Sequence, residues 1–140
     1  MKAPTRHQQR VNVFQLLFET EFRKEETPIN IYQSALIERE IKDTRFTHNL
    51  YFGTIEQLSS IDEVINMHSL NWKTSRMNRV TLSIIRLAVY EMMSSSAPPK
   101  VIINEAIEIV KEFGDEDGFS LVNGILNSYA KSNGLIEPVK

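Results

Sequence analysis

Apolar residues recur at helical spacing along most of the chain. The densest stretch, residues 72–127, contains three apolar runs that Pro98-Pro99 and Gly114 separate. The first run, residues 76–93, is apolar on nearly every side, which is typical of a buried central helix. The stretch therefore predicts three packed helices with this one at their centre.

The second run, residues 98–113, starts with prolines that suit a first helical turn and ends before Gly114, which could supply a left-handed cap. Its spacing predicts an apolar inner face and a polar outer face. The inner face consists of Ile102, Ile103, Ala106, Ile107, Val110 and Phe113, and the outer face of Asn104, Glu105, Glu108, Lys111 and Glu112.

The third run predicts a helix whose inner face leaves Leu121 at its edge and Gly124 nearly opposite. A glycine inside a helix costs about 1 kcal/mol relative to alanine, so Gly124 indicates that a neighbouring helix, a ligand or a partner approaches closely. The inner face consists of Val122, Ile125, Leu126 and Tyr129.

The polar residues of the central run form one narrow stripe, which predicts the side on which this helix reaches the surface. We expect Arg86 to pair with a glutamate such as Glu91, Glu105 or Glu108. The alternative interpretation of the stripe is that Arg76 and Arg79 reach phosphate. The stripe consists of Arg76, Arg79, Ser83, Arg86 and Tyr90.

Helical spacing also predicts four helices in the first half of the chain, over residues 5–24, 29–40, 45–59 and 61–70. With the three later ones this makes about seven helices, and no segment alternates as a strand would. The sequence therefore predicts an all-α fold. The expected inner face of the first helix consists of Val11, Phe14, Leu17, Phe18 and Phe22.

Five sequence blocks in order resemble the carboxy-terminal half of the NusB family of bacterial transcription antitermination factors. They are W-K-x-S-R, I-x-R-L-A-V-Y-E, K-V-x-I-N-E-A-I-E, F-G-D-E-D and V-N-G-I-L. The N-terminal R-x-x-x-R, followed by Gln15-x-Leu17-Phe18, is similar to the family's start. The resemblance implies one domain over residues 1–140, with two three-helix-bundle subdomains, about 1–70 and 71–134, that share one core.

Composition and charge narrow the class of protein further. The 140 residues suffice for one domain, and they include no cysteine, no signal peptide and no apolar run near the roughly 20 residues of a membrane span. A cytoplasmic protein is the default expectation. The net charge is −2, yet residues 1–10 carry +3, so the rest carries −5.

The cations of the N-terminal segment lie where the helix dipole opposes them, so their concentration there invites an explanation beyond solubility. Phosphate binding supplies one, and an ordinary solvated chain end is the alternative. The cations in question are Lys2, Arg6 and Arg10, and His7 lies between them.

No pattern in the chain supports an enzyme, a cofactor or a metal site. The three histidines, His7, His48 and His68, are scattered, and no zinc-protease, phosphate-loop, serine-hydrolase or EF-hand motif occurs. The acidic run from Asp115 to Asp117 is expected to cap the following helix, because hard cations need spaced, converging ligands.

The resemblance implies a function in transcription. NusB proteins bind the boxA element of ribosomal RNA leader transcripts jointly with NusE, a small-subunit ribosomal protein, and join NusA and NusG on RNA polymerase to suppress premature termination. The implied protein is a monomer or homodimer without membrane association.

The resemblance also implies which residues bind. The expected RNA-binding residues are Lys2, Arg6, His7, Arg10, Arg76, Arg79, Asp117, Leu121 and Asn123, and the expected partner-binding residues are Phe18, Phe22 and Thr81. We expect the basic N-terminal segment and the Asp117 loop to form a single cradle for unpaired RNA.

The chain departs from the family pattern at several of these positions. It has Thr81 where members usually have an acid, Gly118 for a serine, Leu121 for a phenylalanine, and His7 and Gln9 within a sparser cationic cluster. Leucine cannot stack on a base as a phenyl ring does, so we expect weak RNA binding alone and greater dependence on the partner.

Two other interpretations stay open at this stage. NusB-like domains also occur at the start of ribosomal RNA cytosine methyltransferases, which would make the chain a fragment of an enzyme. A purely protein-interacting helical module is the second.

Overall fold

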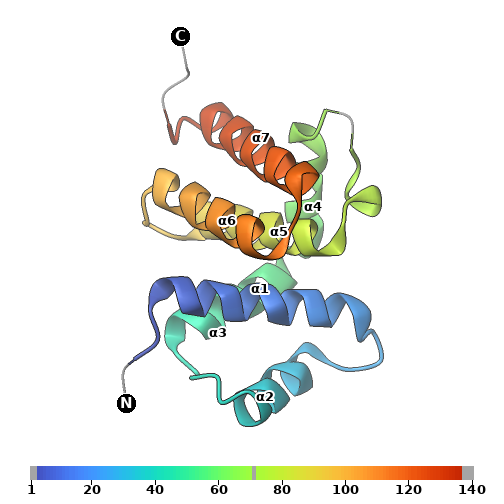
Figure 1. The fold of residues 1–140 in the computed structure, drawn as a ribbon, viewed down its shortest axis with the longest axis vertical. Helices are drawn as coiled ribbons and strands as arrows, with labels where there is room; N and C mark the ends of the chain where they lie inside the picture. Colours follow the sequence, from blue (N-terminus) through green and yellow to red (C-terminus); the bar gives the residue numbers. More distant parts are fainter. Residues whose placement is uncertain (1–2, 71, 137–140) are drawn as a thin grey trace.

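The computed structural model describes residues 3–70 and 72–136, and this part of the chain is all-α, as predicted (Figure 1). It contains seven α-helices and one short 3-10 helix, and no strand occurs among the described residues. The helices are α1 (Arg6–Phe22), α2 (Pro28–Glu38), α3 (Arg45–Glu56), α4 (Leu58–His68), η1 (Thr74–Arg76), α5 (Arg79–Ser94), α6 (Pro99–Phe113) and α7 (Glu116–Ser132).

Local sequence explains where most of these helices begin. Thr5, Thr27 and Thr44 each accept a hydrogen bond from a backbone N–H in the first turn of α1, α2 and α3. The Asp115 carboxylate accepts the Gly118 N–H at 2.8 Å, which confirms that the acidic run caps α7. These caps satisfy backbone donors that the helices themselves leave unpaired.

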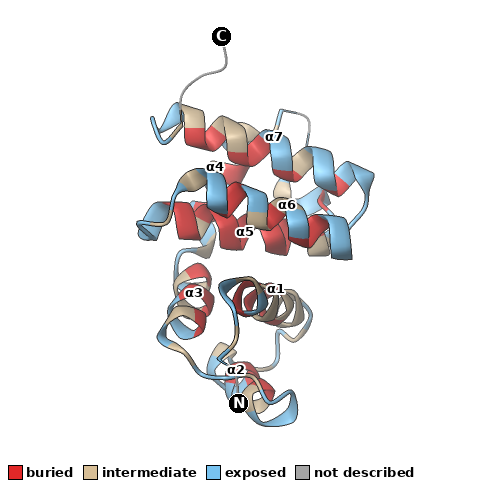
Figure 2. Cartoon of the chain, turned by 60° about the vertical axis from the view of Figure 1, so that its left-hand side comes forward, coloured by how far each residue is buried: buried red, intermediate tan, exposed pale blue. Residues whose placement is uncertain are grey.

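Helix α5 is the centre of the molecule, as its apolar pattern predicted. Residues 81–89 are all buried, and α5 contacts α1, α3, α4, α6 and α7 (Figure 2). Helices α1 to α3 lie on one side of it and α4, α6 and α7 on the other (Figure 1). Because α4 packs on α5 and α7, the spatial division falls between α3 and α4, ahead of the boundary expected near residue 70.

The polar stripe of α5 is largely buried, so the prediction that this side reaches the surface is wrong. Arg86 does not pair with the predicted glutamates. It donates two hydrogen bonds to Asp62, at 2.9 and 2.8 Å, and one to Glu21 at 3.1 Å. Helix α4 and the end of α1 cover this face, and Ser83 beside it is also buried.

Several positions on other helices differ from the periodic expectation. Ile109, which the pattern left out, is buried on α6, whereas Phe113 at its end is partly exposed. Gly114 has φ −111° and ψ −154°, so α6 ends in extended backbone and not in a left-handed cap. Phe22 is 60% exposed because the chain leaves the core at the last turn of α1. The predicted inner face of α7 is confirmed, with Leu121 at its edge.

Within the described ranges, no helix combines the length and the apolar character that crossing a bilayer requires.

Candidate nucleic-acid interface

The first turn of α1 presents Arg6 to solvent beside an aromatic ring of α3. Its guanidinium carbon lies 4.2 Å from the centroid of the Phe46 ring, within the range of a cation–π contact. A capping box fixes this turn, because Thr5 accepts the Gln8 N–H while the Gln8 side chain accepts the Thr5 N–H. The cation and the ring are therefore held together at one edge of the molecule.

Arg10, one turn further on, is buried and serves the fold. Its Nε and Nη2 donate to the two carboxylate oxygens of Glu91 at 2.9 and 2.6 Å, and Nη1 lies 3.7 Å from Glu105. The hydrogen bonds to Glu91 raise the pKa of Arg10 against the opposing effect of burial. The predicted phosphate contact through Arg10 is wrong for this conformation, because the guanidinium is enclosed and already paired.

His7 is likewise engaged by an acid of α6. Its Nδ1 lies 2.6 Å from Glu105 Oε2, so Glu105 faces α1 and not solvent as the spacing suggested. Glu91 and Glu105 thus offset much of the positive charge at the start of α1. Lys2 lies outside the described residues.

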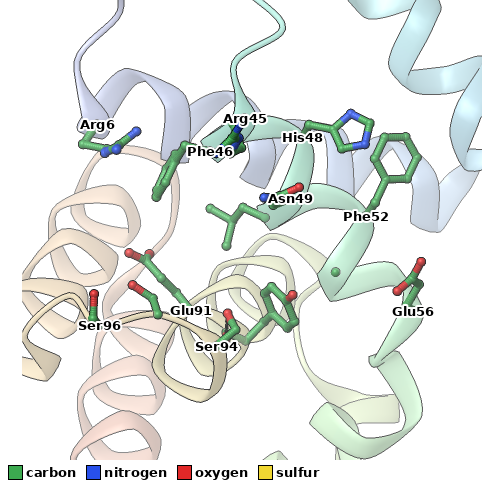
Figure 3. A pocket seen from close by; sticks show the side chains of 14 residues that line it. Arg6, Arg45, Phe46, His48, Asn49, Phe52, Glu56, Glu91, Ser94 and Ser96 are labelled. Carbon is green, nitrogen blue, oxygen red and sulfur yellow. Dashed lines mark hydrogen bonds between the residues drawn. The ribbon is translucent and has the colours of Figure 1, made fainter.

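A groove of about 650 Å³ opens next to Arg6 (Figure 3). Helix α3 lines it with polar and aromatic side chains, and the end of α5 and the loop after it close the opposite side with Ser94 to Ser96. Figure 3 shows Arg6 and Phe46 at one end and Glu56 at the other. The residues of α3 that line it are Arg45, Phe46, His48, Asn49, Leu50, Phe52, Gly53 and Glu56.

The groove combines the groups that single-stranded nucleic acid requires. Arg6 and Arg45 are exposed cations that can meet phosphates, and the N-terminus of α3 adds the positive end of a helix dipole. Phe46 and Phe52 offer ring faces on which unpaired bases can stack, and Asn49 can hydrogen-bond a base edge. The arrangement therefore favours the binding of unpaired nucleic acid.

The sequence did not identify Arg45, Phe46 or Asn49 as candidates. Phe46 falls on the apolar period of its helix, which favours a core position, yet in the structure it is only partly buried. The adjacent cation and aromatic residue at the start of α3 were the available signal, because that pairing is common in nucleic-acid sites.

The second expected RNA element, the start of α7, is built around a close contact with α5. A Cβ on Gly118 would lie 2.5 Å from the Thr81 Oγ1, so glycine permits this approach. Thr81 is only 1% exposed beneath it, and the predicted direct partner contact through Thr81 is therefore wrong for this conformation. Asp117 and Asn123 are exposed and Leu121 is half-buried.

The two expected RNA elements lie along different parts of α1: the basic segment forms its first turn, and the end of α6, after which α7 begins, packs on its middle. His7 contacts Glu105 in the middle of α6, whereas Phe14 contacts Phe113 at its end, with ring centroids 5.3 Å apart. From Glu105 to the end of α6 is about 12 Å of helix at roughly 1.5 Å per residue. A single cradle would therefore have to span a separation of this order, and it stays a prediction.

Arg76 and Arg79, at the start of the central run, differ in whether their side chains are already engaged in the fold. Arg79 donates to Glu21 at 3.0 Å and to the Thr74 carbonyl at 2.7 Å, so its side chain is already engaged. Arg76 is exposed in the 3-10 turn.

An apolar hollow of about 520 Å³ lies beside the last turns of α1. Phe18 and Phe22 border it with ring centroids 4.9 Å apart, and Arg23 and Arg39 stand at its rim. Both arginines pair with Glu19, which holds them in place. Exposed aromatic side chains flanked by arginine are typical of a protein-binding surface.

Among the described residues, no group of three or more His, Cys, Asp or Glu side chains could hold a metal ion.

Comparison with protein families gives a match to the NusB family model over residues 7–131. The chain is 34% identical over 125 residues to the transcription antitermination protein NusB of Staphylococcus haemolyticus, covering 89% of this chain and 98% of that protein. It is 39% identical over 127 residues to the NusB of Pseudothermotoga lettingae, covering 86% of each.

Two solved structures are similar in fold. The T. maritima NusB structure superposes with a TM-score of 0.83 at 35% identity and covers 94% of this chain and 93% of that one. A crystal structure of the antitermination factors NusB and NusE in complex with dsRNA has a TM-score of 0.78 at 24% identity, covering 92% and 99%. Because its sequence identity is only 24%, the second match shows similarity of fold alone.

Proposed function

The chain belongs to the NusB family of transcription antitermination proteins, and on that premise we propose that it binds boxA RNA of ribosomal RNA leader transcripts jointly with NusE. The observation that carries the RNA part is the groove in which Arg6 lies on the Phe46 ring. Its exposed cations and aromatic faces match the needs of unpaired RNA.

The partner site in this proposal is the hollow at the end of α1. Phe18 and Phe22 provide apolar anchors, and Arg23 and Arg39 provide donors at its rim. Support comes from the fold neighbour crystallised with NusE and dsRNA. The groove lies at the start of α1 and the hollow at its end, so one helix would connect RNA and partner.

The resulting pair would join NusA, NusG and RNA polymerase in the cytoplasm and help the polymerase to avoid premature termination. We expect the chain alone to bind RNA weakly, because Glu91 and Glu105 offset the charge of Arg10 and His7. The partner would then supply part of the RNA affinity.

The test is fluorescence anisotropy of a labelled boxA RNA with this protein alone, with NusE alone and with both. We expect tighter binding by the pair, and a loss of about tenfold for Arg6→Ala, since the variant loses one phosphate contact and the support of Phe46. Lys24→Ala, an exposed cation at the far end of α1, is the matched control and should bind as the parent does. Equal RNA affinity with and without NusE would contradict joint binding.

The same measurement separates the two other interpretations. A purely protein-interacting module would bind NusE and show no RNA binding that depends on Arg6. The methyltransferase interpretation loses support because the relatives matched over 86–98% of their length are antitermination proteins.

A further inference from the structure

One amide side chain near the start of α1 is buried, although amide side chains mostly face water. Gln9 is only 5% exposed. Burial of an unpaired amide costs free energy, so both its oxygen and its nitrogen require hydrogen-bond partners. Gln9 finds them on two separate segments of the chain, the start of α3 and the residues that precede α1.

The oxygen of the Gln9 amide holds the start of α3. Thr44, the N-cap residue of α3, donates its hydroxyl hydrogen to Gln9 Oε1, and Thr47 Oγ1 donates to the same oxygen at 3.2 Å. Thr44 Oγ1 also accepts the Thr47 N–H at 3.0 Å, so the hydroxyl that caps α3 is the one that binds Gln9. Gln9 therefore helps to place the first turn of α3, which carries Arg45 and Phe46.

The nitrogen of the same amide holds the segment that enters α1. Gln9 Nε2 donates to the Pro4 carbonyl at 3.2 Å. Pro4 directly precedes Thr5, the N-cap residue of α1, and Arg6 is the first residue of that helix. A carbonyl fixed at this point restricts the backbone from which Arg6 extends.

One amide thus connects the two helix starts that form the contact between Arg6 and Phe46. The guanidinium carbon of Arg10 lies 5.4 Å from the centroid of the same Phe46 ring, and Arg10 is itself fixed by Glu91. Buried groups therefore hold the ring and the first turn of α1, while Arg6 stays exposed. The exposed cation is the part of this arrangement that RNA can reach.

We propose that Gln9 is a positioning residue of the RNA site, which keeps Arg6 on the Phe46 ring before RNA arrives. Because Gln9 is enclosed, it acts only through the groups that it holds. An arginine near a chain end has many rotamers, and ordering such a side chain during binding lowers affinity, so placing it in advance strengthens binding. This inference rests on the proposed function, because the RNA is the same.

The first test requires no RNA. The ring current of an aromatic side chain shifts protons above its face upfield, so NMR spectra of the parent should show upfield-shifted side-chain protons of Arg6. We expect Gln9→Leu to return these protons to ordinary positions, as Phe46→Leu should. Upfield shifts that persist in Gln9→Leu, or that the parent lacks, would overturn the proposal.

The second test is binding of labelled boxA RNA in the presence of NusE, followed by fluorescence anisotropy. We expect Gln9→Leu to weaken binding about tenfold, as Arg6→Ala does. Its salt dependence should fall by about one phosphate contact although the substitution removes no charge. A role in stability alone would leave that slope unchanged, and an unchanged slope would overturn the proposal.

The double variant separates action through Arg6 from any other effect. If Gln9 serves to place Arg6, Gln9→Leu combined with Arg6→Ala should bind RNA no more weakly than either single variant. Losses that multiply in the double variant would show that Gln9 acts by another route, and would overturn the proposal.

The matched control removes a buried hydrogen bond elsewhere in α3. Thr54 is fully buried and its hydroxyl donates to the Leu50 carbonyl at 2.6 Å. Thr54→Val should lower the midpoint of urea denaturation and still bind RNA as the parent does. RNA binding lost equally in Thr54→Val and Gln9→Leu would reduce the Gln9 effect to general destabilisation and overturn the proposal.

Variants of Thr44 test the same hydrogen bond from its other end if Gln9→Leu does not fold. Thr44→Val removes the hydroxyl and should weaken RNA binding, whereas Thr44→Ser keeps it and should bind as the parent does. Equal affinities of these two variants would overturn the proposal.

The outcomes distinguish this inference from the proposed function. RNA binding that depends on Arg6 and is the same in the parent and in Gln9→Leu would overturn the role of Gln9 alone. Absence of RNA binding with and without NusE would overturn the proposed function and this inference together.

Discussion

Arg10 and Glu91 form a buried bidentate ion pair that joins α1 to α5, with both donor atoms within 2.9 Å of the carboxylate. Neither side chain has more than a few per cent of its surface exposed. The pair was unexpected, because Arg10 belongs to a segment whose basic charge indicated RNA binding. In the structure, that segment divides into Arg6, which faces solvent, and Arg10, which holds two helices together.

We therefore expect removal of Arg10 to act mainly on the stability of the protein and less on RNA binding. We expect Arg10→Ala to lower the free energy of unfolding by about 3–5 kcal/mol, because Glu91 is left buried and uncompensated. Urea denaturation followed by circular dichroism measures this loss. Arg6→Ala, the exposed neighbour, should change stability by less than about 0.5 kcal/mol. Equal destabilisation by the two variants would contradict the different roles given to Arg6 and Arg10.

Replacement of Arg10 by methionine together with Glu91 by leucine should recover most of that stability. A buried ion pair can often be exchanged for apolar side chains of similar volume at little net cost. The double variant, measured in the same urea titration, tests whether the loss in Arg10→Ala comes from the stranded carboxylate. A double variant as unstable as the single one would point to lost packing.

Gly53 of α3 should not tolerate alanine. A Cβ at Gly53 would overlap the phenol ring of Tyr90, which packs across α3 from α5. We expect Gly53→Ala to cost about 1–3 kcal/mol, the usual range for overpacking. The combination with Tyr90→Ala should cost less than the sum of the two single variants in thermal denaturation. Additive effects would show that the two side chains do not compete for space.

Gly124→Ala should have the opposite effect. No atom lies within 4 Å of the added Cβ, so the variant gains helix propensity without a clash. We expect an increase of up to about 1 kcal/mol in the free energy of unfolding. A decrease in a denaturant titration would mean that the outer face of α7 is not open in solution.

Acid should weaken the contact between α1 and α5 through Glu21. Burial alone would raise the pKa of Glu21, but hydrogen bonds from Arg86 and Arg79 lower it below its ordinary value. A carboxyl whose pKa is lower in the folded state stabilises the protein above its unfolded pKa, near 4.3, and loses that effect as the pH falls through the folded pKa.

We therefore expect the free energy of unfolding to fall below about pH 4.3 more steeply in the parent than in Glu21→Gln. Urea titrations at pH 7, 5, 4 and 3 measure the difference. Glu25→Gln replaces an exposed glutamate nearby and should keep the parent's pH dependence. Parallel pH profiles for the parent and Glu21→Gln would rule out this linkage.

The helices could be predicted because their signals are local. Threonine caps, the prolines before α6 and the apolar period of α5 act within a few residues of the chain. The partners of Arg86 could not be predicted in the same way. Asp62 and Glu21 are 24 and 65 residues distant, and only the packing of α4 and α1 on α5 brings them together.

The candidate sites were predictable only in part for the same reason. Sequence patterns indicated that Arg6 and Leu121 deserve notice, and both border grooves or exposed surface in the structure. Spacing could not show that His7 and Arg10 contact glutamates of α6 and α5. Nor could it show that Phe46 lies under Arg6, since a partly exposed ring obeys the same period as a buried one.

Phe22 should matter for partner binding and not for stability. Its side chain is 60% exposed and its ring lies against Phe18, so Phe22→Ala should change the free energy of unfolding by less than about 0.5 kcal/mol. If NusE covers the hollow, the same variant should weaken NusE binding by about 2 kcal/mol, roughly thirtyfold, as aromatic anchors at interfaces do. Isothermal titration calorimetry measures the affinity. Ile29→Ala, which removes an apolar side chain of similar exposure from α2, should bind NusE as the parent does. An affinity that falls equally in both variants would place the partner elsewhere than on the end of α1.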